Sequence, residues 1–145
     1  MASLLEKYGW TEWLTHSNYS FLKATSSPKD YIQRAYDLGY QGLGICDYDG
    51  LYGAVKAFSA WKKLEDYGNL RLLYGAEVHT QGDHDKPLLY QDTIILYALN
   101  LRGYQNLCGI LSFCHRKSKD RGYIGLTSLL EHPLDNLIAI LPMRG

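Results

Sequence analysis

Short apolar runs typical of strands alternate along this chain with apolar residues at helical spacing, and this pattern predicts strands separated by helices. Five short runs rich in apolar and β-branched residues are predicted to form buried strands: 12–16, 42–46, 71–78, 93–98 and 136–141. Apolar residues at helical spacing predict four helices: 28–38, 54–61, 103–115 and 127–130. Strands that alternate with helices pair mainly in parallel through right-handed crossovers. The pattern therefore predicts an α/β fold with about five mainly parallel strands and flanking helices.

Turn and capping residues mark the ends of two of these helices. Ser27 followed by Pro28 is a typical helix start, because serine caps the first turn and proline fits its first position. Gly39 is expected to end that helix, since glycine adopts the left-handed conformation that closes a final turn. Thr127 is expected to cap the short helix that follows it. The segment 80–91 is polar and is predicted to be a loop.

The length of the chain limits the architecture. Its 145 residues suit one domain of ordinary size. A closed β/α barrel needs about eight strands and roughly 250 residues. Because the five predicted strands are too few for closure, we expect residues 1–145 to be a single domain that forms the first part of a larger one.

Composition and charge exclude several classes of function. Hydrophobic residues make up 46% of the chain and charged residues 21%, as in a globular protein with a buried core. The 15 basic and 15 acidic residues cancel, which argues against strong nucleic-acid binding by this segment alone. Because no apolar run is long enough to span a membrane, no membrane partner is expected. Three cysteines without a CxxC pair predict reduced core residues and a cytoplasmic location.

Chemically active side chains gather where three of the predicted strands end. His16 ends the first strand, Asp47 and Asp49 follow the second, and Glu77 and His79 end the third. In a β/α barrel these strand ends line the catalytic mouth. Histidine, aspartate and glutamate are metal-binding residue types, yet too few of them stand at metal-ligand spacing. The pattern is typical of a metalloenzyme scaffold that has lost much of its metal chemistry.

Each of these residues also has a structural interpretation. Asp47 and Asp49 flank a turn before a helix, so one can cap that helix while the other accepts hydrogen bonds from loop amides. His16 can be a hydrogen-bonded histidine at the strand end. Glu77 and His79 share one face of a strand by its two-residue period. Together with His16 they are the side chains that can hold a stray divalent ion.

Four short motifs occur in order along the chain. They are His16–Leu22 (HSNYSFL), Cys46–Gly53 (CDYDGLYG), Gly75–Glu77 (GAE) and Tyr97–Leu107 (YALNLRGYQNL), and the apolar run Leu137–Leu141 follows them. This series resembles the PHP (polymerase and histidinol phosphatase) domain. It is most similar to the version at the N-terminus of bacterial DNA polymerase III alpha subunits and their error-prone relatives. The resemblance covers nearly the whole chain but only about the first half of a PHP domain. It implies a partial β/α barrel of PHP type.

Several positions depart from the metal site that the resemblance implies. Active members of the family hold two or three metals with His, Asp, Glu and sometimes Cys. Leu14 and Tyr48 stand where histidines are expected, a third expected histidine falls near Thr93, and a cysteine that is often found falls near Met143. Leucine has no lone pair, and a neutral phenol is a poor metal ligand.

The remaining relic positions are too few for catalysis. His16 and Glu77 stand at ligand positions, with Asp47 at a supporting position. A catalytic zinc needs about three protein ligands and an open position. We therefore expect no catalytic residue, no metal ligand and no cofactor in this segment, with a divalent metal at the relic positions as the alternative.

The first functional hypothesis is structural. The resemblance implies the N-terminal PHP segment of a DNA polymerase III alpha-type polymerase, with features that lean toward the error-prone type, active in DNA replication or translesion synthesis and repair. The intact parent is then a DNA-directed DNA polymerase, a nucleotidyltransferase, whose catalytic residues lie outside this chain. The expected partners are the rest of the polymerase chain and a proofreading or other replisome subunit, with DNA reached only through the intact protein.

Two alternatives stay open. One is a free-standing metal-dependent PHP phosphoesterase with a reduced site of His16, Asp47, Glu77 and His79. The other is a non-catalytic binding module that self-associates or docks on a partner, because an open β/α half leaves an apolar edge and face to cover.

Overall fold

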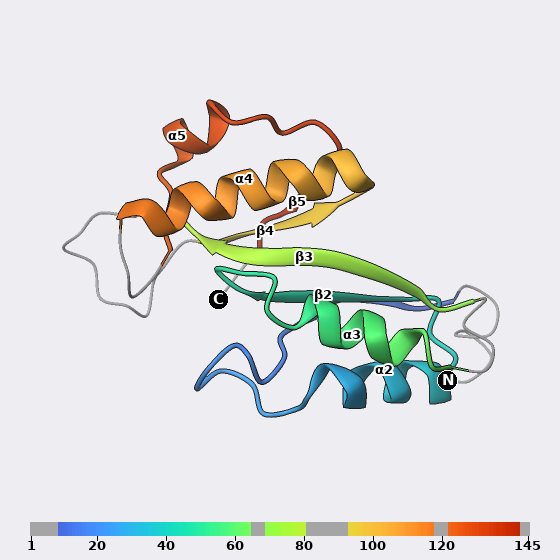
Figure 1. Cartoon of the computed structure of the whole chain (residues 1–145). Helices are drawn as coiled ribbons and strands as arrows, with labels where there is room; N and C mark the ends of the chain where they lie inside the picture. Colours follow the sequence, from blue (N-terminus) through green and yellow to red (C-terminus); the bar gives the residue numbers. More distant parts are fainter. Residues whose placement is uncertain (1–8, 65–68, 81–92, 118–121, 143–145) are drawn as a thin grey trace. The chain divides into compact units, whose positions relative to one another are not determined.

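A computed structural model of the chain describes residues 9–64, 69–80, 93–117 and 122–142 (Figure 1). The strands are β1 (Thr11–Thr15), β2 (Gly42–Tyr48), β3 (Arg71–His79), β4 (Thr93–Ala98) and β5 (Leu137–Ile140). The helices are α2 (Pro28–Asp37), α3 (Ala54–Trp61), α4 (Leu101–Lys117) and α5 (Leu126–Leu130). Neighbouring strands are hydrogen-bonded in chain order, from β1 to β5. The predicted α/β fold class, with five strands and flanking helices, is confirmed.

The chain divides into two compact units, and β3 runs through both. The first unit comprises residues 1–47 and 51–74, and it holds β1, most of β2, both α2 and α3, and the start of β3. The second comprises residues 48–50 and 75–145, and it holds the rest of β3 with β4, α4, α5 and β5. A single domain over residues 1–145 stays a prediction.

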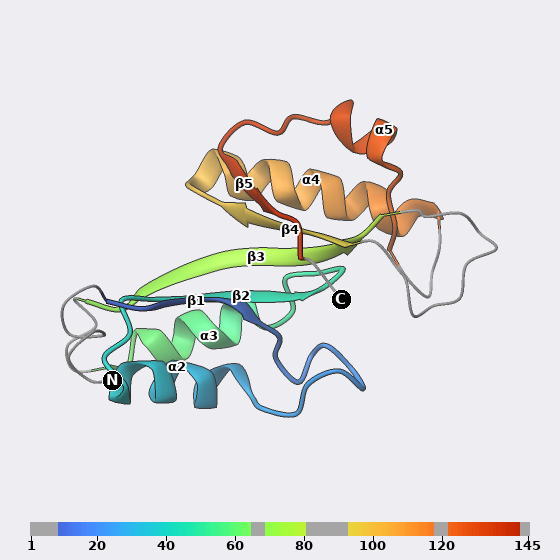
Figure 2. The same cartoon turned by 180° about the vertical axis from the view of Figure 1, so that it is seen from behind.

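In the first unit, two parallel strands support two helices. β1 pairs in parallel with β2, and the register shifts between Glu12 and Thr15. Helices α2 and α3 pack against each other and lie on the same side of these strands in both views (Figures 1 and 2). The core of this unit is made of buried apolar residues from both helices, from β2 and from the position just before β3: Ile32, Ala35, Leu43, Ile45, Ala57 and Leu70.

Helix α2 begins and ends as the sequence predicts. The Ser27 hydroxyl oxygen accepts the N–H of Asp30, and the Asp30 carboxylate accepts the N–H of Ser27, which makes a capping box. Pro28 follows at the first position of the helix. Gly39 has a φ of +67° just beyond the last turn, in the left-handed region where glycine is favoured.

The second unit departs from the parallel pairing expected from the sequence, because β5 pairs antiparallel with β4. Helix α4 packs against both strands. The chain then returns alongside α4, since the Asn106 side-chain amide donates to the Asp135 carbonyl (2.9 Å) and the Leu99 N–H donates to the Asn136 carbonyl (3.0 Å). β5 therefore starts beside the end of β4 and runs back along it. The core of this unit is formed by buried residues of β3, β4 and α4.

The short helix α5 starts earlier than the sequence suggests. Gly125, with an extended backbone at φ −66° and ψ 146°, is its N-cap, so the expectation that Thr127 caps this helix is wrong. Thr127 lies inside the helix, in which the side chain of Leu129 is buried. The loop predicted at 80–91 lies outside the described residues except for Thr80. Among the residues described, no helix is both long and apolar enough to cross a membrane.

Candidate functional site

The carboxylate of Asp47 is the centre of a hydrogen-bond network in the first unit. Asp47 lies near the end of β2 and is 1% exposed. Its Oδ1 accepts the N–H of Ser17 (2.7 Å) and the hydroxyl of Ser20 (2.8 Å), and its Oδ2 accepts the N–H of Gly53 (2.9 Å). The Ser17 hydroxyl lies 2.9 Å from both oxygens. A buried carboxylate is costly unless it is hydrogen-bonded, and these bonds satisfy it. They tie the loop after β1 and the start of α3 to β2.

Gly53 is required by this network. It is the N-cap of α3, and a Cβ at this position would lie 2.5 Å from Oδ2 of Asp47 and 2.8 Å from Oγ of Ser17. Neither atom can move away without breaking a hydrogen bond to the buried carboxylate. The glycine of the motif that ends at Gly53 therefore serves the packing of the Asp47 network. Asp47 accepts the main-chain N–H of the N-cap residue Gly53, but no side chain caps the first turn of α3, so the expectation that one of these acids caps the helix is wrong.

His16 lies beside the thiol of Cys46. The His16 Nε2 is 3.9 Å from Sγ of Cys46, and that sulfur is 3.6 Å from the carbonyl oxygens of Trp13 and Thr15. Cys46 is fully buried, so its thiol is not accessible to a ligand. The contact places His16 at the strand end, as the sequence predicts.

A groove of about 400 Å³ opens beside His16 in the same unit. Residues of β1, α2 and β2, of the loop after β1 and of the turn after α2 line it: Glu12, Leu14, Thr15, His16, Lys23, Ala24, Tyr31, Arg34, Ala35, Leu38, Tyr40 and Leu43. Leu14, which stands where the resemblance implies a histidine, is 51% exposed. This position contributes apolar surface to the groove and no metal ligand.

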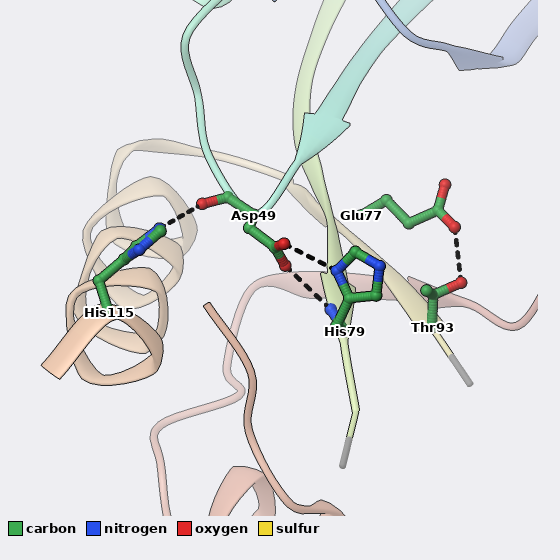
Figure 3. A network of polar contacts seen from close by, with 5 residues as sticks. All are labelled: Asp49, Glu77, His79, Thr93 and His115. Carbon is green, nitrogen blue, oxygen red and sulfur yellow. Dashed lines mark hydrogen bonds and ion pairs between the residues drawn. The ribbon is translucent and has the colours of Figure 1, made fainter. Parts of the chain in front are cut away.

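In the second unit, Asp49 binds two histidines (Figure 3). Its Oδ2 lies 2.7 Å from Nδ1 of His79, and its Oδ1 accepts the main-chain N–H of His79 at 3.1 Å. The Nε2 of His115, on α4, donates to the main-chain carbonyl of Asp49 at 2.7 Å. Asp49 has a φ of +53°, a conformation that aspartate adopts more readily than most residues. The ring of Tyr48 stacks on that of His79 with 5.5 Å between ring centroids.

Glu77 is hydrogen-bonded to Thr93 in the same unit. The Thr93 hydroxyl donates to Oε1 of Glu77 at 2.6 Å, and Glu77 is only 1% exposed (Figure 3). The resemblance implies a histidine near Thr93, and here a hydroxyl donor contacts the carboxylate. Glu77 and His79 thus belong to one unit, but each contacts a different side chain.

Cys114 adds no reactive thiolate to this unit. Burial and the negative charge of Asp49 raise the pKa of the Cys114 thiol to about 11. The thiol is therefore protonated at neutral pH. Since thiolate is the form that attacks electrophiles and binds metals, Cys114 is an inert core residue.

The described residues do not assemble a metal centre. Within 9–64, 69–80, 93–117 and 122–142, no three His, Cys, Asp or Glu side chains are grouped so that they could hold one ion. Of the relic positions, His16 and Asp47 belong to the first unit and Glu77 belongs to the second. The arrangement fixes loops and helix ends through buried carboxylates.

Comparison with protein-family models identifies the family. The model of the PHP domain matches residues 14–144, which is nearly all of the chain. The chain belongs to the PHP domain family. The resemblance carried by the four sequence motifs is thereby confirmed.

Curated relatives of this PHP chain include error-prone DNA polymerases. It is 32% identical over 117 residues to the one from Bdellovibrio bacteriovorus, and 36% identical over 124 residues to one from Pseudomonas fluorescens. These matches cover 76% and 86% of the PHP chain but only 10% and 11% of the two polymerases. The chain therefore spans about a tenth of the length of these relatives.

Among solved structures, the PHP chain is similar to an amidohydrolase from Chromobacterium violaceum. The TM-score is 0.50 at 21% identity, over 70% of the PHP chain and 31% of the amidohydrolase chain. At this level of identity the likeness concerns the fold alone.

Four residues that contact Asp47, Asp49 or Glu77 are not among those predicted from the sequence: Ser17, Ser20, Thr93 and His115. Ser17 and Ser20 are three positions apart directly after a strand, and that spacing could have identified them as donors to the acid that ends the next strand. No comparable signal exists for Thr93 and His115, which lie 16 and 66 positions from their partners. Only the folded chain brings these residues together.

Proposed function

We propose that this chain is the PHP segment of a bacterial DNA polymerase III alpha-type polymerase of the error-prone kind. In this proposal its role is structural, and its metal site is degenerate. Identities of 32% and 36% to error-prone DNA polymerases support the polymerase assignment. The segment then works in the cytoplasm, in DNA replication or translesion synthesis, within a longer chain whose other residues carry out nucleotidyl transfer.

The observation that carries the structural role is the use of the buried carboxylates inside the fold. Asp47 accepts hydrogen bonds from Ser17, Ser20 and Gly53, and Glu77 accepts one from Thr93. A two-metal hydrolytic site needs bridging carboxylates with open lone pairs and several further ligands. A metal at Asp47 would have to displace donors that hold two loops in place. These bonds argue against a catalytic metal at Asp47.

An exposed apolar tip supports the interaction role. Phe21 is 81% exposed and Leu22 is fully exposed, at the end of the loop that Asp47 holds through Ser17 and Ser20. Leu22 has a φ of +62°, a strained conformation for a leucine. A loop that is tied to a buried carboxylate and presents two large apolar side chains suits contact with another protein surface. In this proposal that surface belongs to the rest of the polymerase chain or to a proofreading or other replisome subunit.

A primer-extension assay tests the polymerase assignment. The complete translated product of the reading frame that holds this chain is compared with residues 1–145 alone on a primed DNA template. We expect extension by the complete product and none by residues 1–145. Failure of the complete product to extend the primer, with a correctly folded protein, would overturn the assignment.

The alternative function is metal-dependent phosphoester hydrolysis at His16, Asp47, Glu77 and His79. It predicts chelator-sensitive turnover of p-nitrophenyl phosphate by residues 1–145 in the presence of Zn²⁺ or Mn²⁺. The proposal predicts no turnover above buffer. Turnover that Glu77→Ala abolishes, and that the exposed control Glu131→Ala retains, would replace the proposal with this alternative.

A further inference from the structure

The side chains of α3 are distributed against the usual rule for a surface helix. Its buried residues are two alanines, Ala54 and Ala57, whereas Val55 is 70% exposed and Phe58 is 39% exposed. Tyr52, just before the helix, is 54% exposed. An amphipathic helix normally turns its large apolar side chains toward the core. Large apolar side chains that recur on the exposed side of one helix mark an interaction surface.

The opposite side of α3 is held within the first unit. Helix α3 packs against α2, and in both views the two helices lie on the same side of β1 and β2 (Figures 1 and 2). The indole N–H of Trp61 donates to the main-chain carbonyl of Leu70 at 2.7 Å, and Ala57 is fully buried in the core. The helix therefore cannot turn its exposed apolar side chains inward without losing these contacts.

Lysines accompany the exposed apolar side chains. Lys56, Lys62 and Lys63 are exposed, and the segment 50–64 contains no aspartate or glutamate. The ammonium of Lys62 lies 5.2 Å from the centroid of the Phe58 ring. The outer face of α3 is defined here by six residues: Tyr52, Val55, Lys56, Phe58, Lys62 and Lys63. It combines apolar surface with positive charge only.

This composition selects the chemistry of the surface that fits it. A protein interface buries an apolar centre inside a polar rim. Positive charge at the rim favours carboxylates on the other side and repels ammonium and guanidinium groups. The complementary surface therefore carries apolar residues flanked by aspartate and glutamate.

We propose that the outer face of α3 docks on an acidic surface with an apolar centre elsewhere in the complete polymerase chain. Val55 and Phe58 supply the apolar contacts. Lys56, Lys62 and Lys63 pair with the carboxylates around them. This docking surface lies on a different element from the apolar tip of the loop after β1.

The choice of the same polypeptide as the occupant rests on the proposed function. The chain spans about a tenth of the length of the error-prone DNA polymerases that it matches. A surface of the same polypeptide meets α3 at a high effective concentration, so even a small contact is occupied. A separate protein needs a larger interface to stay bound. The outer face of this one short helix suits the first case.

Lysine acetylation followed by mass spectrometry tests the proposal. The complete translated product of the reading frame that holds this chain, and residues 1–145 alone, are each treated with a limiting amount of acetic anhydride. We expect Lys56, Lys62 and Lys63 to react several-fold more slowly in the complete product, because the docked surface covers them. Lys29, exposed on α2, is the matched control and should react equally in both proteins.

Variants of the complete product test whether the contact depends on charge. Lys56→Glu together with Lys63→Glu opposes like charges across the interface, so Lys62 should react as fast as it does in residues 1–145. Lys56→Arg together with Lys63→Arg keeps the charge and should keep Lys62 slow. Lys29→Glu adds a negative charge outside the face and should also keep Lys62 slow. An unchanged melting temperature and circular dichroism spectrum would show that each variant is folded.

The results separate this inference from the proposed function. A complete product that extends a primer while its three α3 lysines react as fast as in residues 1–145 would overturn the inference alone. The same holds if Lys29 slows as much as those lysines, or if Lys62 stays slow in the double Glu variant. Slow α3 lysines in a complete product that does not extend a primer would keep the docking surface and overturn the polymerase assignment.

Discussion

The Nδ1 atom of His79 lies 2.7 Å from Oδ2 of Asp49, while Oδ1 of the same carboxylate accepts the His79 main-chain N–H. One aspartate thus binds both the ring and the backbone of one histidine. These are two of the residue types from which a metal site would be built, and in this fold they contact each other. Glu77 is also bonded within the fold, because its carboxylate accepts a hydrogen bond from Thr93. In the proposed function, Asp47, Asp49 and Glu77 are structural anchors.

Replacing Asp47 should strongly destabilise the chain. Asp47→Ala leaves the buried N–H groups of Ser17 and Gly53 and two hydroxyls without their acceptor, so the free energy of unfolding should fall by about 3 kcal/mol or more. Urea unfolding followed by circular dichroism measures this. Asp135→Ala, which removes an exposed carboxylate, is the matched control and should change stability by less than about 0.5 kcal/mol. Equal effects of the two variants would contradict the structural role of Asp47.

Two glycines should respond in opposite directions to the same substitution. Gly53→Ala forces a Cβ to within 2.5 Å of the Asp47 carboxylate and should lower stability by about 1–3 kcal/mol. Gly109→Ala, in the middle of α4, meets nothing within 4 Å and should raise stability by about 0.5–1 kcal/mol. Thermal unfolding of both variants gives the comparison. A neutral Gly53→Ala would mean that the close approach to Asp47 does not exist in solution.

The hydroxyl of Thr93 should matter more than its shape. Thr93→Val keeps the size and branching of the side chain but removes the donor to buried Glu77, so stability should fall by about 1–3 kcal/mol. Thr127→Val, on the exposed surface of α5, is the control, and its effect should be within about 0.5 kcal/mol. Chemical denaturation of both variants at neutral pH gives the two values. If Thr127→Val loses as much stability as Thr93→Val, the lost bond to Glu77 is not the cause of the effect.

The protonated thiol of Cys114 makes stability depend on alkaline pH. Burial and the negative charge of Asp49 raise its pKa from 9.0 to about 11. Between these values the unfolded chain loses the thiol proton before the folded chain does, so folding weakens as pH rises. Below about pH 9 the thiol is protonated in both states, so it does not change the free energy of unfolding. At about pH 10 the free energy of unfolding is lower by about 1 kcal/mol.

Urea unfolding of the wild type and of Cys114→Ala at about pH 8 and about pH 10 measures this contribution. The wild type should lose more stability than the variant over that interval, because the variant has no thiol to ionise at this position. A variant that follows the same pH dependence as the wild type would assign the effect to other groups.

Local signals predicted most elements, and long-range contacts decided the rest. The capping box of Ser27 and Asp30 and the left-handed Gly39 depend on neighbouring residues only, so the limits of α2 could be predicted from the sequence. The antiparallel direction of β5 could not, because it depends on contacts such as the one between Asn106 and the Asp135 carbonyl, 29 positions apart.

In the candidate site too, local motifs predicted some residues, and long-range contacts brought in the others. The motifs located Asp47 and Glu77, and the departures at Leu14, Tyr48 and Thr93 predict that metal ligands are missing, which stays a prediction. The sequence did not predict that Thr93 would contact Glu77. Pairings of this kind join strands through the fold, and no spacing rule in one sequence identifies them.

Bound metal per chain is the most direct test of the claim that these acids are structural anchors. Residues 1–145 are purified, incubated with Zn²⁺ or Mn²⁺, passed through gel filtration and assayed by inductively coupled plasma mass spectrometry. We predict far less than one metal ion per chain, with no change in Glu77→Ala. One or more ions retained per chain, and lost in Glu77→Ala but kept in Glu131→Ala, would contradict the account.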